Sequence, residues 1–256
     1  VLTDCPITDE RVVAVWREVM LASEHLPPAA RLRGAVRLVG DTSATFTLEG
    51  AREWPALDRF AAATPSLAGV WWQPEHQRRR LVHERSDVAA GASFVQVNAA
   101  VADALHAHVL ERAHAHRPRH VVDAYAGSGA TAIPLAASGI RVTAIEFDRE
   151  AAAVTRASFT AASQSLVGRV EDVLARALPA DVVLLNPPRA GVQTAVTVAL
   201  RAAPPRAIIY TSCNPATLAR DIARLPQYRI ASLEGFDMFP QTAHVETVCE
   251  LVLEGA

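Results

Sequence analysis

Two residues in the C-terminal part of the chain have side chains suited to nucleophilic attack and proton transfer. Cys213 lies in residues 212–221 (SCNPATLARD), between an apolar run and a helix expected to begin near Pro215. The positive dipole at the amino end of a helix favours a thiolate, so this position indicates a nucleophile more than an inert buried thiol. Glu246 begins or enters the apolar run 247–253, where a carboxylate is either a surface charge or an active-site base.

A glycine-rich turn predicts a site for a nucleoside. Residues 121–129 (VVDAYAGSG) form an apolar strand that ends in a Gly-x-Gly turn and opens a helix. Such glycines let the backbone approach a ligand at the carboxyl end of a strand. The next expected strand ends at Glu146, where a carboxylate can accept both ribose hydroxyls. Ala132 replaces the third glycine of the dinucleotide fingerprint, so a dinucleotide, S-adenosylmethionine and a plain strand–turn–helix all remain compatible with this segment.

A third segment favours S-adenosylmethionine over a dinucleotide. Residues 181–189 (DVVLLNPPR) place Asn186 at the end of an apolar strand, and the two prolines that follow stiffen the turn and fix the direction of its amide. This arrangement resembles the substrate-side loop of S-adenosylmethionine-dependent methyltransferases. Many of those that methylate planar nitrogen carry an aromatic residue where Arg189 stands here, so Arg189 disfavours amino-group methylation.

The elements that must position these residues fall into two regions. From Phe94 onward, apolar strands alternate with helices, which is typical of a mostly parallel sheet covered on both faces. Two adjacent terminal strands, 228–237 and 244–253, are expected to add an antiparallel edge. The other expected strands are 120–124, 141–146, 181–185 and 207–211, and the expected helices are 99–114, 130–138, 149–162, 192–202 and 215–224.

Residues 1–92 predict a small α+β domain, and residues 93–256 form the second predicted domain. A helix after Thr8 or Asp9 places Val12, Trp16, Val19 and Met20 on one face, and strands are expected at 33–39, 45–48, 70–72 and 80–83. Trp71 and Trp72 are interpreted as core or edge aromatics in preference to a stacking surface for nucleic-acid bases.

Composition limits the class of protein. Of the 256 residues 50% are hydrophobic, which supports a sizeable core and excludes a disordered or collagen-like chain. The net charge of -2 indicates neither a nucleic-acid coat nor a membrane-surface protein. All 25 basic residues are Arg, a compositional bias that would not hinder an RNA partner. We expect no membrane helix and no signal segment, and three widely spaced cysteines favour reduced thiols in a cytoplasm.

Together with residues 94–98 (FVQVN) and 237–246 (DMFPQTAHVE), the motifs resemble the RNA uracil-5-methyltransferase family. The ribosomal-RNA branch is the closer likeness, and the resemblance is dense from Phe94 to Leu253 and loose before. It implies a class I S-adenosylmethionine-dependent methyltransferase fold: Rossmann-like α/β, with a mostly parallel seven-stranded sheet and an antiparallel edge, preceded by a small α+β domain that contacts RNA. It also implies methylation of carbon 5 of a uridine in RNA, with 23S rRNA favoured and tRNA possible.

The resemblance implies a covalent mechanism. Addition of the Cys213 thiolate at carbon 6 makes the ring an enolate, whose carbon 5 can attack the sulfonium methyl of S-adenosylmethionine, and Glu246 then removes the carbon 5 proton. A target base must leave its stack to be reached, which favours a loop or an opened helix. The implied cofactor or substrate contacts are Gln96, Tyr125, Gly127, Gly129, Glu146 (ribose), Asp172 (near the adenine) and Asn186.

The chain departs from the family pattern at three places. Asn186 replaces the usual Asp, but an amide can match a ring N–H and a carbonyl of uracil, so we expect activity to survive. Ala130 replaces a cofactor-contact Asn. Many members carry an RNA-binding barrel and a four-cysteine iron–sulfur cluster; residues 4–7 resemble the segment with the last cluster cysteine, and Cys5 can hold a cluster only if a longer protein supplies the others. Since the chain begins with Val1, we expect a longer enzyme.

Other interpretations remain open. They are a cytosine-5 or amino-group nucleic-acid methyltransferase, a non-catalytic RNA-binding protein with a methyltransferase fold, and a nicotinamide-dependent oxidoreductase. The presence of both Cys213 and Glu246 argues against the non-catalytic protein. No metal site is predicted, because the histidines between 106 and 116 have no cysteine at a suitable spacing. The sequence leaves the oligomeric state open.

Overall fold

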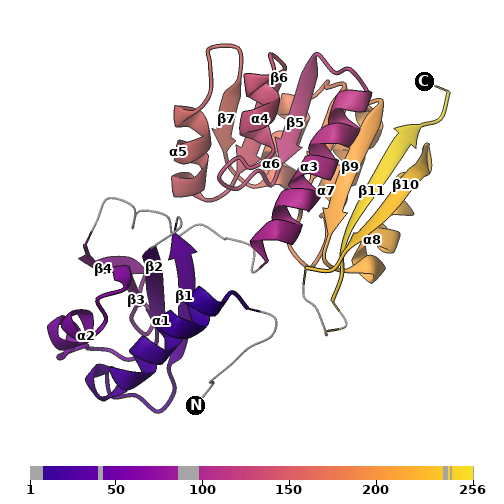
Figure 1. Cartoon of the computed structure of the whole chain (residues 1–256). Coiled ribbons are helices and arrows are strands. Elements are labelled where there is room, and N and C mark those ends of the chain that lie inside the picture. Colours follow the sequence, from indigo (N-terminus) through magenta and orange to yellow (C-terminus); the bar gives the residue numbers. More distant parts are fainter. Residues whose placement is uncertain (1–7, 40–42, 86–97, 239–241, 243, 256) are drawn as a thin grey trace. The chain divides into compact units, whose positions relative to one another are not determined.

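The computed structural model describes residues 8–39, 43–85, 98–238, 242 and 244–255 (Figure 1). The chain divides into two compact units, Val1–Val97 and Asn98–Ala256, which we call unit 1 and unit 2. The domain boundary predicted after residue 92 lies outside the described residues, as do Cys5 and Gln96.

Unit 1 is a four-stranded sheet with helices on one face. Its strand order is β1-β2-β3-β4, in which β2 and β3 run parallel and the other neighbours run antiparallel. The elements are α1 (Glu10–Leu21), the 3-10 helix η1 (Ser23–His25), β1 (Arg33–Val39), β2 (Ser43–Glu49), α2 (Leu57–Ala63), β3 (Leu67–Gln73) and β4 (Arg80–Glu84). The predicted helix and strands of this region are therefore confirmed.

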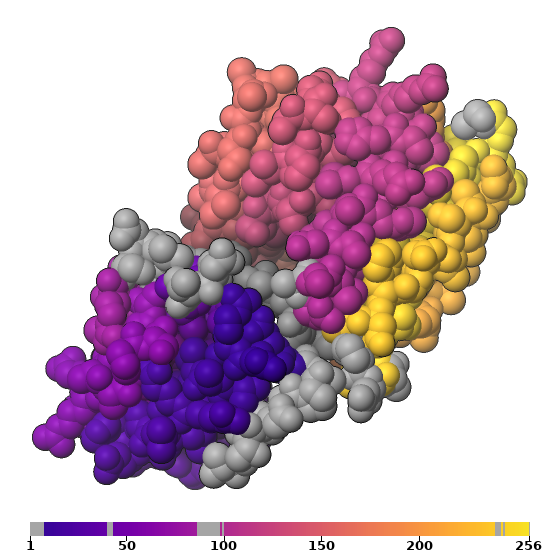
Figure 2. Space-filling model, in the orientation of Figure 1, coloured from indigo at the N-terminus to yellow at the C-terminus, as the bar shows by residue number. Residues whose placement is uncertain are grey.

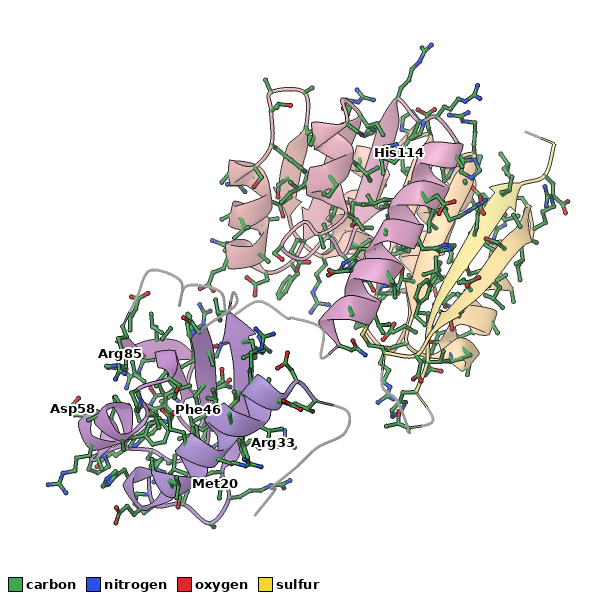
Figure 3. All side chains as sticks on the ribbon, viewed as in Figure 1. Met20, Arg33, Phe46, Asp58, Arg85 and His114 are labelled. Carbon is green, nitrogen blue, oxygen red and sulfur yellow. The ribbon has the colours of Figure 1, made fainter. Side chains whose placement is uncertain are left out.

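The core of unit 1 is built around aromatic side chains (Figure 3). Phe46 of β2 packs against Phe60 of α2, with ring centroids 5.4 Å apart, and both rings are fully buried. Trp71 and Trp72 are also buried, which confirms their interpretation as packing residues. The predicted buried face of α1 was only partly right: Val19 is buried, whereas Val12 and Met20 are half-buried, and Val13 and Val15 are buried in addition.

Unit 2 is a seven-stranded sheet of order β10-β11-β9-β8-β5-β6-β7, in which the five strands from β9 to β7 are parallel and β11 runs antiparallel to both neighbours. This confirms the predicted mostly parallel sheet with an antiparallel edge. The elements are α3 (Ala99–Ala115), β5 (His120–Ala124), α4 (Ala132–Ala137), β6 (Arg141–Glu146), α5 (Arg149–Ala157), β7 (Gln164–Val167), α6 (Val170–Ala177), β8 (Val182–Leu185), α7 (Thr194–Ala202), β9 (Ala207–Ser212), α8 (Pro215–Ile222), β10 (Tyr228–Phe236) and β11 (Glu246–Leu253).

Both faces of this sheet are buried, because successive residues of each strand point to opposite sides. Val121 and Leu184 pack with α3 and α4 on one face, whereas Val122 and Leu185 pack with α6, α7 and α8 on the other. Strand β7 was not predicted, since its four residues at the sheet edge, two exposed and two half-buried, lack a β-branched apolar run. Helix α5 ends earlier than predicted, at Ala157, and Ser158 forms its C-cap.

A buried ion pair connects α3 to the antiparallel strands of unit 2. Glu250 of β11 is 2% exposed and accepts hydrogen bonds from Arg112 at 2.9 Å and Ser232 at 3.0 Å. His116 at the end of α3 lies 2.6 Å from the other carboxylate oxygen. The α3 residues and the C-terminal strands lie side by side on the visible face of unit 2 (Figure 2).

Candidate active site

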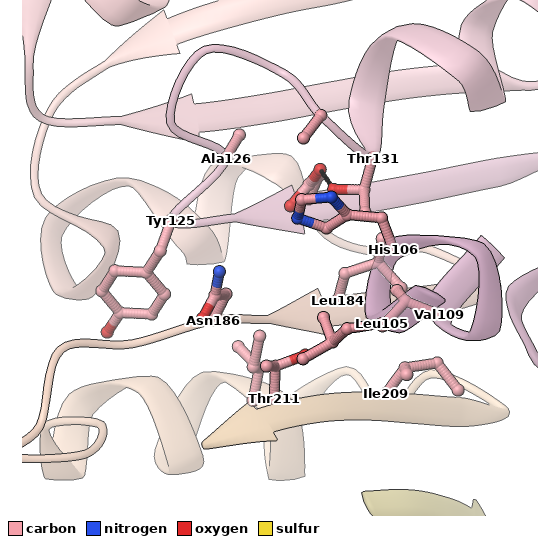
Figure 4. Close-up of a pocket in the computed structure, with 13 residues that line it drawn as sticks. Leu105, His106, Val109, Tyr125, Ala126, Thr131, Leu184, Asn186, Ile209 and Thr211 are labelled. Atoms are coloured by element: carbon pink, nitrogen blue, oxygen red, sulfur yellow. Dashed lines mark hydrogen bonds between the residues drawn. The ribbon is translucent and has the colours of Figure 1, made fainter. Parts of the chain in front are cut away.

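The carboxyl ends of four neighbouring strands, β9, β8, β5 and β6, meet at one edge of the unit 2 sheet. Because these strands are parallel, the residues that follow them gather at this edge. A cavity of about 40 Å³ lies here between α3 and the strand ends (Figure 4). It is lined by Leu105, His106, Val109, Asp123, Tyr125, Ala126, Ala130, Thr131, Leu184, Leu185, Asn186, Ile209 and Thr211.

The turn after β5 requires both of its glycines. Gly127 and Gly129 have φ of 56° and 90°, in the left-handed region that glycine occupies without strain. A Cβ on Gly129 would lie 2.8 Å from Ile133 and 2.9 Å from the hydroxyl of Thr155, whereas a Cβ on Gly127 would meet nothing within 4 Å. Gly129 therefore allows close packing, and Gly127 leaves open space beside the backbone.

Glu146 lies beside this turn and helps to hold it. One carboxylate oxygen accepts the backbone N–H of Gly127 at 2.8 Å, and the other accepts the N–H of Asp148 at 2.8 Å. Each carboxylate oxygen keeps a second lone pair for another donor. The carboxylate is therefore fixed in position at the end of β6 and can still accept ribose hydroxyls.

Asp123 is a buried carboxyl group in the cavity wall that the sequence analysis did not single out as a site residue. It is 2% exposed, and the Thr131 hydroxyl donates to it at 2.6 Å (Figure 4). Burial raises its pKa to about 7. Burial also lowers the pKa of His106, which lines the same cavity. An acidic residue inside an apolar strand, next to the glycine turn, was the sequence signal for Asp123.

Cys213 and Glu246 lie at facing ends of two neighbouring strands. Ser212 of β9 pairs with Thr247 of β11, and the strands are antiparallel, so the next residues at this edge are Cys213 and Glu246. Cys213 is half-buried and Glu246 is 7% exposed. The residues are 33 positions apart in sequence (246 minus 213), and only the sheet pairing brings them together.

Burial dominates the electrostatics of this pair. Burial, and secondarily the negative charge of Glu246, raise the pKa of the Cys213 thiol. The dipole of α8 favours the thiolate, but burial outweighs the groups that favour the charged form. Burial also raises the pKa of Glu246.

Arg189 acts against burial at both residues. Its positive charge lowers the pKa of Cys213 and of Glu246. It follows the Asn186-Pro-Pro turn, and its guanidinium lies 2.7 Å from a ring nitrogen of His244, two residues before Glu246. From the sequence, Arg189 served only to disfavour amino-group methylation. The sequence signal for its effect on the pKa of Cys213 and Glu246 was a cation at the end of a substrate-side loop.

Asn186 and Tyr125 lie between the glycine turn and Cys213. Both line the cavity, and their side chains lie next to each other in Figure 4. The backbone N–H of Asn186 donates to Ala124 of the neighbouring strand at 3.3 Å, while its side chain is exposed. Tyr125 has φ of 66° although it is not glycine, and burial raises the pKa of its hydroxyl. The positive φ strains the backbone and turns the Tyr125 ring away from the direction of β5.

Asp172 is an exposed residue in the first turn of α6, which follows edge strand β7. Phe147, directly after Glu146, is 67% exposed, and the guanidinium of Arg169 lies 5.6 Å from its ring centre. The sequence analysis did not single out Phe147, although an exposed aromatic after the ribose-binding candidate could pack against a base.

The predicted residues thus form two groups. Tyr125, Gly127, Gly129, Glu146 and Asp172 lie around the ends of β5, β6 and β7, and Asn186, Cys213 and Glu246 lie around the ends of β8, β9 and the start of β11. Among the described residues, no group of three or more His, Cys, Asp or Glu is arranged to hold a metal ion. No helix in the described part of the chain is long and apolar enough to cross a membrane.

Comparison with known proteins identifies the family. Residues 156–254 match the tRNA (Uracil-5-)-methyltransferase family. The chain is 33% identical over 297 residues to the 23S rRNA (uracil(747)-C(5))-methyltransferase RlmC of Cronobacter sakazakii, covering 99% of this chain and 78% of the relative. It is 36% identical over 290 residues to RlmC of Escherichia coli O157:H7, covering 98% of this chain and 77% of the relative.

A solved structure shares the fold. The Pyrococcus abyssi tRNA (uracil-54, C5)-methyltransferase, in complex with S-adenosyl-L-homocysteine, matches with a TM-score of 0.68 at 22% identity, over 98% of this chain and 69% of the solved chain. This likeness confirms the methyltransferase fold expected from the sequence. With relatives above 30% identity over most of both chains, this protein belongs to the RNA uracil-5-methyltransferase family.

Proposed function

We propose that this protein methylates carbon 5 of a uridine in RNA, with S-adenosylmethionine as methyl donor. The observation that carries the proposal is the facing position of Cys213 and Glu246 at the ends of β9 and β11, beside Asn186 at the end of β8. The names of the relatives support 23S rRNA as the substrate. The solved neighbour's name makes tRNA the second candidate. An RNA substrate of this kind favours a cytoplasmic enzyme.

The residues around β5 and β6 fit the methyl donor. Glu146 is a fixed carboxylate for the ribose, and Gly127 leaves open space beside the backbone. The carboxyl of Asp123 and the Tyr125 ring line the adjoining cavity, and the Asp123 carboxylate can attract the ammonium group of the methyl donor. When bound, S-adenosylmethionine supplies an electrophilic methyl group. Asp172 and Phe147 are the proposed neighbours of the adenine.

Cys213 begins the reaction in this proposal. Carbon 5 of uracil is a weak nucleophile, and addition of the Cys213 thiolate to carbon 6 moves the electron pair of the 5,6 double bond into an enolate. Burial raises the pKa of Cys213, and a backbone hydrogen bond at Cys213 and then the positive charge of Arg189 lower it. Arg189 therefore acts as an electrostatic stabiliser of the nucleophile.

Glu246 ends the reaction. Once carbon 5 carries the methyl group, the Glu246 carboxylate accepts the remaining carbon 5 proton, the 5,6 double bond re-forms, and the carbon 6–sulfur bond breaks to release the thiolate. A raised pKa makes Glu246 a stronger base than an exposed carboxylate. Asn186 is proposed to select the base, since its amide can accept from the ring N–H and donate to a carbonyl.

Unit 1 is proposed to contact the RNA, because it exposes three consecutive arginines, Arg78–Arg80, at the start of β4. Guanidinium groups bind phosphate oxygens, and each phosphate contact steepens the salt dependence of binding. Replacing all three by Gln is expected to weaken RNA binding and flatten its dependence on salt concentration. Unchanged salt dependence would remove these arginines from the RNA-binding surface.

Release of tritium tests the proposed reaction and distinguishes it from cytosine methylation. The protein is incubated with S-adenosylmethionine and 23S rRNA labelled with tritium at carbon 5 of either uridine or cytidine. The proposal predicts that tritium appears in water from the uridine-labelled RNA alone, in step with methyl incorporation. Release from the cytidine-labelled RNA, or methyl incorporation without release, would contradict it.

A further inference from the structure

Asp221 is a buried carboxylate that the proposed reaction does not use. It lies near the end of α8 and is 0% exposed. One carboxylate oxygen accepts the backbone N–H of Val192 at 2.8 Å and the hydroxyl of Tyr210 at 2.8 Å. The other accepts from Arg220 at 2.8 Å and from Arg224 at 3.2 Å. A buried charge with this many partners fixes the groups around it.

The partners of Asp221 reach the loop that follows the Asn186-Pro-Pro turn. Arg220 donates to the carbonyl of Ala190 at 2.8 Å while it is held by Asp221. The Thr217 hydroxyl, one turn earlier on α8, lies 3.4 Å from the carbonyl oxygen of Arg189 and 3.0 Å from that of Asn214, the closer acceptor for its single proton. Helix α8 thus holds this loop at two backbone groups, the carbonyl of Ala190 through Arg220 and the N–H of Val192 through Asp221.

Gly191 makes this close approach possible. Its φ is 76°, and a Cβ at this position would lie 2.3 Å from the Asp221 carboxylate and 2.5 Å from Arg220. The loop also closes on itself, since the N–H of Gly191 donates to the carbonyl of Pro188 at 2.8 Å. A rigid loop pressed against a buried carboxylate has a single defined position.

We propose that Asp221 is a positioning residue that holds residues 186–192, and with them Asn186 and Arg189, in register with Cys213. Helix α8 begins at Pro215, two residues after Cys213, so the helix that positions the loop is also fixed to the nucleophile. The inference rests on the proposed function, because it assigns Asn186 and Arg189 to the base and the thiolate. Loss of the carboxylate would leave these side chains intact and misplace them.

The test compares Asp221→Asn and Arg220→Gln with Arg201→Gln, an exposed arginine on α7 that serves as the matched control. Asp221→Asn is expected to lower kcat about 100-fold, the effect of a misplacement of about 1 Å, and to leave the affinity for S-adenosylmethionine unchanged. Arg220→Gln changes the same loop from a half-exposed position and is expected to lower kcat less. Arg201→Gln is expected to match the wild type.

A second readout follows the thiol itself. The rate of alkylation of Cys213 by iodoacetamide is measured against pH by mass spectrometry of the Cys213 peptide. If Arg189 moves away, the alkylation profile shifts to higher pH in Asp221→Asn and Arg220→Gln. Folded variants with the wild-type kcat and the wild-type profile would overturn the inference. If the alkylation profile shifts in the variants but the wild type does not methylate uridine, the positioning role of Asp221 is supported and the proposed function is overturned.

Discussion

Cys213 directly follows β9 and faces Glu246, the first residue of β11, one position beyond the pair formed by Ser212 and Thr247. A nucleophile and a proton acceptor that act in turn on adjacent carbons of one uracil ring must both reach that ring. The antiparallel pairing of the strands supplies that arrangement. Burial raises the pKa of each residue, and the positive charge of Arg189 reduces this rise at both. The two strand ends therefore combine a shielded site with one cation that favours the charged form of both groups.

Removing the proton acceptor Glu246 is expected to trap the covalent adduct between Cys213 and the uridine. Glu246→Gln keeps the size of the side chain and leaves Cys213 free to add, but the carbon 5 proton has no acceptor. Release of product should slow by about 100-fold or more, in the range expected for a general base. A covalent complex with ordinary uridine RNA should then accumulate on denaturing gels. Loss of both product and complex would assign Glu246 to an earlier step.

Replacing the cation is expected to move the pH dependence. Arg189→Gln removes the charge that lowers the pKa values of Cys213 and Glu246, so both should rise further. The reaction needs the thiolate, and the rising limb of kcat/KM should therefore shift to higher pH. Activity measured across a pH series checks this. An unshifted limb with a uniformly lower rate would mean that Arg189 binds substrate and does not stabilise the thiolate.

Asp123 is expected to make the binding of the methyl donor depend on pH. Its pKa of about 7 means that the carboxylate forms as pH rises through neutrality. A carboxylate attracts the cationic groups of S-adenosylmethionine more strongly than the neutral acid does. The affinity measured by calorimetry should increase through this range in the wild type and stay level in Asp123→Asn. A matching increase in the variant would assign the dependence to another group.

The buried ion pair of Glu250 with Arg112 and His116 is expected to stabilise unit 2 at neutral pH and to contribute less stability in acid. Burial would raise the pKa of Glu250, but hydrogen bonds from His116, Arg112 and Ser232 hold it below its usual value. A depressed carboxyl pKa contributes stability above the unfolded-state pKa and loses it as pH falls through the folded-state value. Glu250→Gln should cost about 2 kcal/mol at neutral pH. Denaturant unfolding should show this difference shrinking in acid.

Much of the fold could be predicted because its signals are local. The alternation of apolar strands and helices from residue 120 to 253 and the glycine turn are visible within short windows of sequence. Edge strand β7 was not predicted from the sequence, because Gln164–Val167 is short, has no buried residue and forms a strand through pairing with β6. Tertiary pairing, in this case, overrides weak local preference.

The candidate site was harder, because its geometry is non-local. The types of Cys213 and Glu246 could be read from the sequence, but their facing position depends on the pairing of β11 with β9. The raised pKa of Cys213 could not be predicted, since burial depends on packing that no local pattern reveals. The contacts of Asp221 with Val192 and Tyr210 likewise join segments that only the folded chain brings together.

Trapping with 5-fluorouridine RNA tests the covalent role of Cys213 most directly. Fluorine at carbon 5 cannot be removed as a proton by Glu246, so the adduct persists through denaturation. The wild type, and Cys249→Ala as a control for the buried cysteine of β11, should form an RNA–protein complex that maps to Cys213 by mass spectrometry. Cys213→Ala should form none. An undiminished complex in Cys213→Ala, or no complex from a wild type that methylates uridine RNA, would contradict the mechanism.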